Sequence, residues 1–478
     1  MRPTTPLQEK TPFAITAEPM DAIITARAGL SAVSRALRSL GLPGFCEAHV
    51  NVKQRSRGFT VGQQVESLVM LHASGGDCKE DMESLREDTG ITKMLGYAAP
   101  SARCVGDFLE LFHDQEKVSN AREQAHAQGG LAFIPEQTAT LEGLGCTASC
   151  LVGSIAKLQG APTQATIDMD ATIIESHKRD AKRTYEGTRG YQPMVAMWAE
   201  TNLIVADEFR DGNVPAMMAP LVCAKAALAA LPKTVTQYSF RGDSACHESG
   251  LINWLRNEQR DEGPKGPILF AVSARMSVEL AQALKNVPDV QWVTVATEKD
   301  GTLRQCAEVD FVPGEKVEKK SIEPLRYVGL RLLKPQGDLF SDGHDRHFHA
   351  VLTNRTEESA WILTWQRAKA GTIEHIHDEL KNGLGGGQLP SNKFGANAAW
   401  FRIACMAHNV LQAIRYACPD EELKNAKAKR LRFKLFNVTG RFSRDRRKIS
   451  LHLAAPVKWI KQLIELFNRF PLATRATG

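Results

Sequence analysis

Residues 165–172 read ATIDMDAT, a short β-prone run that ends in two acids. The run Ala165–Asp170 predicts a buried strand. A buried strand rarely ends in two carboxylates for packing reasons, because burying a carboxylate is costly. Asp168 and Asp170 therefore indicate either a site of chemistry or, in the simpler interpretation, a turn or a helix cap at the end of the strand.

The sequence after this strand alternates between β-prone and helical runs. The predicted elements are strands at 191–201 and 203–210, a helix at 216–231, a strand at 234–240, a helix at 247–259 and a strand at 268–273. Three strands, a helix, a strand, a helix and a strand favour an α/β layer with a parallel portion.

Two further acids lie in contexts that suggest chemistry. Asp243 follows the predicted strand at 234–240, and open α/β sheets place their sites at the carboxyl ends of parallel strands. Glu374 lies inside a predicted helix. Taken singly, each acid is explained as a cap, a turn or a solvated helix residue. Together with Asp170, they can chelate two Mg²⁺ ions, which activate the attacking oxygen and stabilise the leaving oxygen of a phosphoryl displacement.

The whole chain is predicted to divide into five parts. These are a flexible leader at 1–27, a helical region at 28–163 that ends in a linker at 127–163, an α/β core at 164–287 and 355–417, an antiparallel β-strand insertion at 288–354, and a basic region at 418–478. Within the core, Tyr185–Gly190 is predicted as a turn between strands, because it lacks the Gly-Lys-Ser/Thr of a phosphate-binding loop.

Composition narrows the class of protein. The formal net charge of +6 suits a nucleic-acid partner without requiring one. There is no apolar run of about 18 residues, so no membrane segment is predicted, and the N-terminus has no apolar signal region. Ten cysteines without a CxxC pair predict reduced thiols in the cytoplasm and no structural zinc.

Residues 424–448 carry eleven Lys or Arg residues and one acid, Asp445, with phenylalanines interleaved. A charge run is usually a solvated face. So large an excess, in a chain that is nearly balanced elsewhere, favours contact with DNA phosphates. The residues predicted to make this contact are Arg430, Arg432, Lys434, Arg446 and Arg447.

Three stretches resemble bacterial insertion-sequence transposases of the DDE class. They are DATIIESHKRDAKRTYEGTRGYQP at 170–193, RGDS at 241–244 and GTIEHIHDELKNGLGGGQLPSNKFGANAAWF at 371–401. The resemblance covers roughly residues 30–450, and it is to the subgroup with a β-strand insertion between the second Asp and the Glu. The 131 residues from Asp243 to Glu374 accommodate that insertion.

This resemblance implies an RNase H-like fold in which Asp170, Asp243 and Glu374 bind two Mg²⁺ ions, with Mn²⁺ as a substitute. It also implies terminal inverted repeats and target DNA as partners, with the helical N-terminal region as a candidate for binding the transposon ends. The expected protein is a homodimer on DNA, in the bacterial cytoplasm and associated with the nucleoid when bound.

One departure from the family pattern concerns the helix of Glu374. Some relatives place an Arg and a Tyr one and two turns before the Glu, and a Lys seven residues after it. Lys381 fits the last position, but position 370 is Ala and position 367 is Arg. Lys381, Arg367 and Lys369 are therefore predicted to contact DNA.

Three functions remain open at this point. The first is a cut-and-paste transposase that cleaves at transposon ends and joins them to target DNA. The second is a structure-specific nuclease on the same fold, and the third is a DNA-binding protein without catalysis. The presence of all three acids argues against the third.

The choice between Asp168 and Asp170 cannot rest on the strand period, because residues two apart point to the same face. Asp170 is preferred because it is nearer the carboxyl end and because the resembled family has Asp-x-Thr at its first catalytic acid. Asp168 is expected to pair with Lys178 or Arg189, or to adjust the site indirectly.

Overall fold

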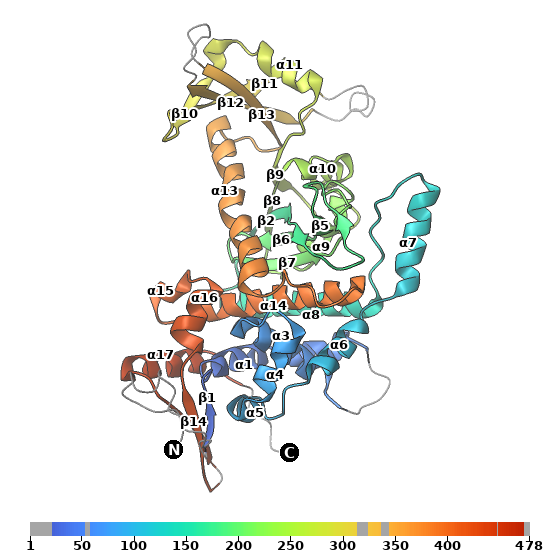
Figure 1. Ribbon diagram of the computed structural model, residues 1–478. Coiled ribbons are helices and arrows are strands. Elements are labelled where there is room, and N and C mark those ends of the chain that lie inside the picture. Colours follow the sequence, from blue (N-terminus) through green and yellow to red (C-terminus); the bar gives the residue numbers. More distant parts are fainter. Residues whose placement is uncertain (1–21, 53–57, 313–323, 336–343, 447, 473–478) are drawn as a thin grey trace, which may run out of the picture.

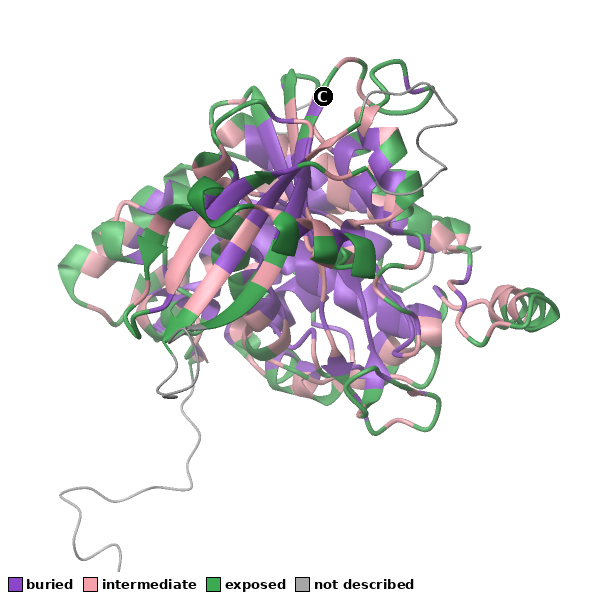
Figure 2. Ribbon diagram, turned by 90° about the horizontal axis from the view of Figure 1, so that it is seen from above, coloured by how far each residue is buried: buried purple, intermediate pink, exposed green. Residues whose placement is uncertain are grey.

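A nine-stranded sheet organises the molecule in the computed structural model, which describes residues 22–52, 58–312, 324–335, 344–446 and 448–472 (Figure 1). The strand order is β10-β11-β12-β13-β9-β8-β2-β6-β7. Buried residues are concentrated in the centre of the molecule, and exposed residues surround them (Figure 2).

Five strands form the core half of this sheet. They are β2 (Gln164–Ala171), β6 (Met194–Trp198), β7 (Leu203–Glu208), β8 (Gln237–Gly242) and β9 (Ile268–Ser273). Strands β2, β6 and β7 pair antiparallel, while β2, β8 and β9 pair parallel. The order β7-β6-β2-β8-β9 with these directions is the RNase H-like arrangement, as predicted.

Four strands between β9 and the last core helix form the insertion. They are β10 (Val293–Thr297), β11 (Leu303–Val309), β12 (Arg326–Pro335) and β13 (His344–Thr353), all antiparallel. Strand β13 also pairs with β9, from Val351↔Ser273 to Thr353↔Ala271. The insertion therefore extends the core sheet and shares its hydrogen bonding, which the sequence did not indicate.

Helices cover both faces of the sheet. Helices α9 (Pro220–Ala229) and α10 (Ser249–Arg256) lie on one side of the core strands, and α13 (Ser359–Asp378) lies on the other (Figure 1). The first half of α13 packs on the insertion through Ile362 and Leu363, and its second half packs on β2 and β8. Helix α11 (Val278–Asn286) packs on β13. One long helix thus connects the insertion to the core strands.

The N-terminal region is helical and wraps around α14 (Phe394–Ala417), which is buried along nearly its whole length. The other helices are α1 (Leu30–Ser39), α2 (Leu42–His49), α3 (Val61–Ser74), α4 (Met82–Arg86), α5 (Thr89–Leu95), α6 (Ala102–Glu110), α7 (Gln115–Ala127), α8 (Ala139–Leu158), α15 (Glu421–Lys424), α16 (Ala428–Leu431) and α17 (Val457–Asn468). Short 3₁₀ turns are η2 (Lys79–Asp81), η3 (Ser244–Cys246) and η4 (Asp289–Gln291); η5 (Glu379–Gly383) and η6 (Arg432–Phe436) are π-helical.

Helix α8 corrects the prediction of a linker at 127–163. It packs against α2, α14 and β7, with Leu144, Leu151 and Val152 fully buried. By length and composition alone α8 is apolar enough to cross a membrane, and its buried contacts identify it as a core helix.

The free edge of β7 is covered by a side chain of α14. The amide of Asn409 accepts a hydrogen bond from the Ile204 nitrogen and donates one to the Ile204 oxygen, both at 2.8 Å. The side chain therefore imitates a neighbouring strand and satisfies an edge that would otherwise be open to pairing.

Two regions far apart in the sequence form a second sheet at the end of the molecule opposite the insertion (Figure 1). Strand β1 (Ile23–Thr25) pairs with β14 (Gly440–Asp445), and β14 pairs with β15 (Lys448–Leu453). The predicted flexible leader at 1–27 is thus wrong for its last residues, because they form a strand with the basic segment. Residues 1–21 lie outside the described residues.

Candidate active site

Strand register brings Asp170 and Asp243 together. The last parallel pair between β2 and β8 is Met169↔Gly242, and each aspartate is the next residue along the chain. Parallel neighbours are about 4.8 Å apart, so the two carboxyl groups meet at the carboxyl edge of the sheet. Asp170 is partly exposed, and Asp243 also accepts a hydrogen bond from the Ala245 nitrogen at 3.1 Å, which caps the following turn.

A buried lysine of α13 lies against this pair. Lys369 Nζ is 3.0 Å from Asp170 Oδ2 and donates to the Met169 carbonyl at 3.3 Å. Burial alone would lower the pKa of Lys369, but the charges of Asp170 and Asp243 outweigh it and raise the pKa. Lys369 is thus a counter-ion of the acid pair, and it does not lie on the surface that a DNA phosphate contact requires.

The pKa of Asp243 is also shifted by opposing effects. Burial raises its pKa, Lys369 lowers it, and the nearby charge of Asp170 raises it again, with a net increase. Two carboxylates with one ammonium between them leave excess negative charge at the sheet edge. A hard divalent cation is the group that such an oxygen pair accommodates.

Asp168 lies two residues before Asp170 on β2, and neighbouring core residues hold its carboxylate in place. It is fully buried and accepts two hydrogen bonds from Arg241, its cross-strand neighbour on β8, at 2.6 and 2.8 Å. Thr372 of α13 donates a third at 2.7 Å. The expected partners Lys178 and Arg189 were wrong, because Arg189 instead donates to backbone oxygens of its own hairpin.

Glu374 is exposed on α13 and lies five residues beyond Lys369. On a helix of 100° per residue, Glu374 points about 140° away from Lys369 and about 60° away from His377. Burial lowers the pKa of His377 to about 4, and the charge of Asp170 opposes that decrease. The sequence analysis missed His377, Arg241 and Thr372 as neighbours of the site.

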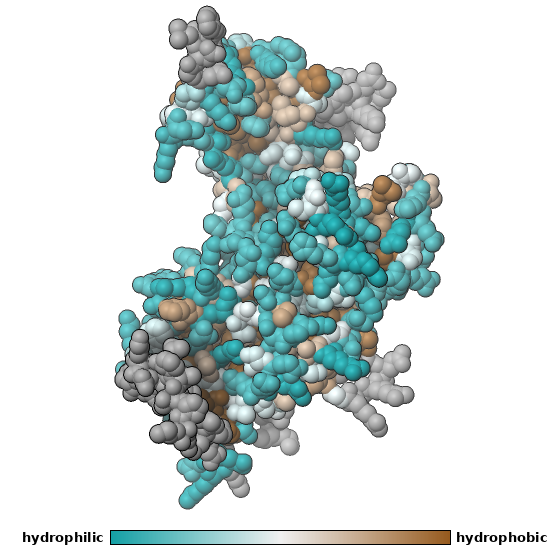
Figure 3. Space-filling model, in the orientation of Figure 1, coloured by the Kyte–Doolittle hydropathy of each residue, from teal (hydrophilic) through white to brown (hydrophobic). Residues whose placement is uncertain are grey.

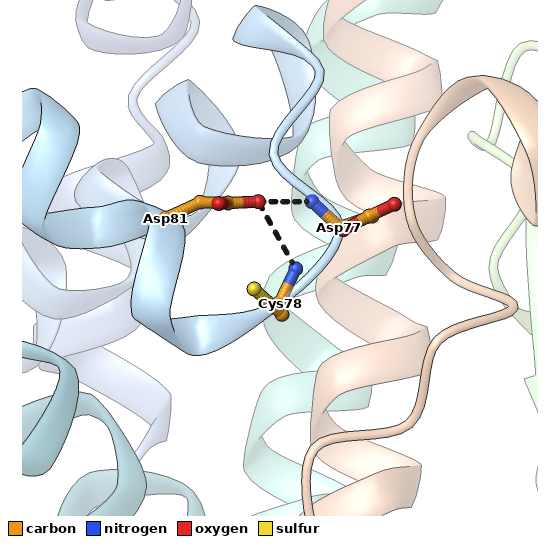
Figure 4. A group of neighbouring side chains, drawn as sticks. All are labelled: Asp77, Cys78 and Asp81. Atoms are coloured by element: carbon orange, nitrogen blue, oxygen red, sulfur yellow. Dashed lines mark hydrogen bonds between the residues drawn. The ribbon is translucent and has the colours of Figure 1, made fainter.

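The three predicted acids do not converge as closely as metal ligands do. Within the described part of the chain, the set of three possible ligands within 4.8 Å of one another is Asp77, Cys78 and Asp81 (Figure 4). Asp81 Oδ2 accepts from the nitrogens of Asp77 and Cys78, at 3.0 and 3.4 Å, so that carboxylate closes a turn before α4. Asp170 and Asp243 suit a hard cation, whereas Glu374 is exposed on α13.

An open hollow of about 630 Å³ contains both aspartates. Its walls come from the hairpin after β2, from the loop 212–217 and from Arg275. The surface around the waist between the insertion and the rest of the molecule is mainly hydrophilic (Figure 3). A phosphodiester can therefore reach the acids from solvent through this hollow.

The other predicted DNA contacts lie in different places. Arg367 is 57% exposed and pairs with Glu298 at 3.2 Å, while Lys381 donates to the Ile173 carbonyl at 3.3 Å. In the basic region, the structure describes four of the five residues predicted to contact DNA. Arg430 lies near Glu422, and Arg432 donates to the Gly383 carbonyl. Lys434 lies over the Trp459 ring, and Arg446 is exposed at the tip of the β14–β15 hairpin. Arg447 lies outside the described residues.

Comparison with protein families gives a match over residues 14–474 to the family described as transposase DDE domain group 1. The chain belongs to this family. It is therefore a DNA transposase, a DNA-cleaving and strand-transferring enzyme, and DDE transposases generally depend on divalent metal ions.

A solved structure resembles the transposase over much of its length. It is described as a cryo-EM structure of the piggyBac transposase synaptic complex with hairpin DNA, at 11% identity and a TM-score of 0.45. The match covers 87% of this chain and 82% of that one. No curated protein matches the transposase.

Proposed function

We propose that Asp170, Asp243 and Glu374 are the acids of the transposase and hold two Mg²⁺ ions, with Mn²⁺ as a substitute. The observation that carries this proposal is the juxtaposition of Asp170 and Asp243 one residue beyond their last registered pair. When bound, the ions activate the attacking oxygen and stabilise the leaving one. Glu374 completes the set from α13, the helix that also positions Lys369.

The protein's own residues hold this edge in place. Arg241 fixes Asp168 and, through β8, the strand that carries Asp243. Lys369 offsets part of the negative charge that Asp170 and Asp243 accumulate before DNA arrives. Burial of the strands under α13 keeps water from the inner side of the carboxylates, while the hollow leaves their outer side open to a phosphodiester.

The proposed substrates are the terminal inverted repeats of a bacterial insertion sequence and a target duplex, joined by cut-and-paste transposition. We propose a homodimer on DNA, because two ends must be cut together, and a cytoplasmic enzyme that associates with the nucleoid when bound.

Exposed and partly buried cations supply further DNA contacts in this proposal. Arg430 and Arg446 lie on the surface near the C-terminal end, and Arg367 and Lys381 flank Glu374 on α13 and η5. Each phosphate contact that is lost flattens the dependence of log affinity on log salt by about one unit. Arg432 is mostly committed to the Gly383 carbonyl, so we expect it to contribute less.

The decisive experiment removes one oxygen ligand at a time. We expect Asp170→Asn, Asp243→Asn and Glu374→Gln each to abolish Mg²⁺-dependent cleavage of DNA that carries the inverted repeats flanking the coding region. DNA affinity should change little, because each substitution preserves shape.

The matched control is Glu358→Gln, an exposed acid that precedes the same α13. It should cleave at the wild-type rate. Wild-type cleavage rates in any of the three variants would remove that residue from the set, and cleavage without strand joining by the wild type would favour the structure-specific nuclease.

A further inference from the structure

The hairpin between β2 and β6 forms one wall of the hollow above Asp170 and Asp243. Its strands β3 (Ile174–Glu175), β4 (Lys182–Arg183) and β5 (Arg189–Tyr191) form a small sheet in the order β3-β5-β4. The turn between β4 and β5 carries Tyr185, which is 77% exposed and lines the hollow that contains both aspartates.

This turn is held firmly even though its tip is exposed. The Thr184 nitrogen donates to the Thr188 carbonyl at 2.8 Å, and the Gly187 nitrogen donates to the Thr184 carbonyl at 3.1 Å. Gly187 has φ +89°, a left-handed conformation that favours glycine. The Tyr185 ring therefore stands on a fixed support, and ordering it on a ligand costs little conformational entropy.

The base of the hairpin is anchored to the core. Tyr191 is 2% exposed, its ring lies 5.0 Å from that of Phe209, and its backbone bridges to Asp211. Gly190 allows close approach, because a Cβ there would lie 2.0 Å from the Ile174 carbonyl oxygen. The wall is consequently part of the rigid core that carries the catalytic acids.

Tyr185 also lies within the electrostatic field of the acids. Burial raises its pKa, followed by the charge of Glu186 and then those of Asp170 and Asp243. Tyr185 is 77% exposed and lines the hollow, so most of its ring is open to a ligand there. A planar ligand face would cover this exposed ring.

Two arginines complete the walls. Arg183 on β4 and Arg275 after β9 are both exposed and both line the hollow, and neither has a carboxylate partner among the described residues. Arg189 on the same hairpin differs, because its guanidinium donates to the carbonyls of Arg179 and Ala181 and so stabilises the hairpin itself. The Arg275 guanidinium contacts Met217 Sδ, a weak acceptor, at 3.8 Å. Two guanidinium groups without a carboxylate partner, in the same hollow as the acid pair, suit an anionic chain whose phosphates alternate with planar bases.

We propose that Arg183, Tyr185 and Arg275 grip the DNA strand that is cut: Tyr185 stacks on a base next to the scissile phosphate, and the two arginines hold the flanking phosphates. This inference rests on the proposed function of Asp170 and Asp243. Stacking requires an uncovered base face, so the favoured substrate has an unpaired nucleotide at the cleavage site.

The test measures binding apart from cleavage. The probe is a duplex–single-strand junction of the flanking inverted repeat, with 2-aminopurine at the junction, titrated with full-length protein in Ca²⁺. The wild type should quench the fluorophore, and Tyr185→Ala should abolish the quenching and weaken binding roughly 5- to 150-fold, the range for one lost base stack. Tyr185→Phe keeps the ring and should behave as wild type.

Controls separate this inference from the proposed function. Tyr416→Ala removes another exposed tyrosine, on α14, and should change nothing. Arg183→Ala and Arg275→Ala should each flatten the dependence of log affinity on log salt by about one unit, while Lys285→Ala on α11 should not.

If Asp243→Asn abolishes cleavage but Tyr185→Ala quenches the fluorophore normally, the proposed contact of Tyr185 with the cut strand is wrong, while the proposed role of the acids is kept. Equal losses in Tyr185→Ala and Tyr185→Phe would also overturn stacking.

Discussion

Helix α13 and its π-helical extension η5 carry two charged clusters that are built in opposite ways. At the sheet edge, one ammonium, Lys369, faces two carboxylates, Asp170 and Asp243, and the set opens into a hollow. At the first residue of η5, directly after α13, Glu379 is buried with two basic partners from α14, Arg415 and His408. The first cluster has an excess of acid and access to solvent, whereas the second has neither.

Every oxygen of Glu379 has a donor. Its carboxylate is bonded to Arg415, lies 2.8 Å from His408 Nδ1, and accepts from the Ala428 nitrogen at 2.7 Å. Burial alone would raise its pKa, but the His408 hydrogen bond and the charges of His408 and Arg415 hold the pKa well below its ordinary value. A balanced buried cluster specifies packing, while an unbalanced exposed one is available for a ligand.

The largest effect that would test this contrast is on stability. We expect Glu379→Ala to lower the free energy of unfolding in urea by about 3–5 kcal/mol, because Arg415 would remain buried without its acid. Asp378→Ala, which removes the neighbouring exposed acid bonded to Lys427, should cost about 1 kcal/mol or less. Similar losses in both variants would show that burial does not distinguish the clusters.

The same cluster predicts a pH dependence. Because the folded pKa of Glu379 is depressed, its contribution is complete above the ordinary glutamate pKa and is lost as the pH falls through the folded value. The stability difference between wild type and Glu379→Ala should therefore shrink in acid. A difference that is constant from neutral to strongly acidic pH would contradict this assignment.

A second test compares the two acids of β2. We expect Asp170→Asn to be inactive and Asp168→Asn to retain cleavage reduced roughly 10- to 100-fold at saturating Mg²⁺, since Asp168 acts through Arg241 and Thr372. Asp168→Asn should also unfold at lower urea, because it leaves Arg241 partly uncompensated. The reverse ranking of activities would exchange the roles of the two aspartates.

The smallest expected effect concerns Lys369. Lys369→Met removes a positive charge 3.0 Å from Asp170, so we expect Mn²⁺ to bind up to about ten-fold more tightly by calorimetry, while the metal-free protein becomes less stable. Arg367→Met on the exposed side of α13 should leave Mn²⁺ affinity unchanged. Weaker Mn²⁺ binding by Lys369→Met would mean that the ammonium organises the ligands and does not compete with the metal.

Much of the core half of the nine-stranded sheet could be predicted, because the sequence patterns that specify it are local. The run at 165–170 is apolar and ends in acids, Pro232 ends a helical stretch, and the order of strands and helices then defines the RNase H-like arrangement. Asp170 and Asp243 could be paired because both follow strands that are expected to be parallel.

The remaining features depend on contacts between distant segments. Helix α8 looks like a linker because it contains glycines, but Gly143 is needed where a Cβ would lie 2.0 Å from the His49 carbonyl oxygen of α2. Lys369 looks like a surface residue of a helix, and only the position of α13 on the sheet brings it to Asp170. The partner of Asp168 was likewise set by the β2–β8 register, which the sequence alone did not specify.

The pairing of β1 with β14 has a consequence for biosynthesis. Ile23 leaves the ribosome early, but its partner Phe442 is made more than 400 residues later. At about 5–20 residues per second, this interval is roughly 20–80 s, during which β1 remains an unpaired edge. A chain that stalls before Gly440 cannot close this sheet, so β1 is paired only after β14 has been made.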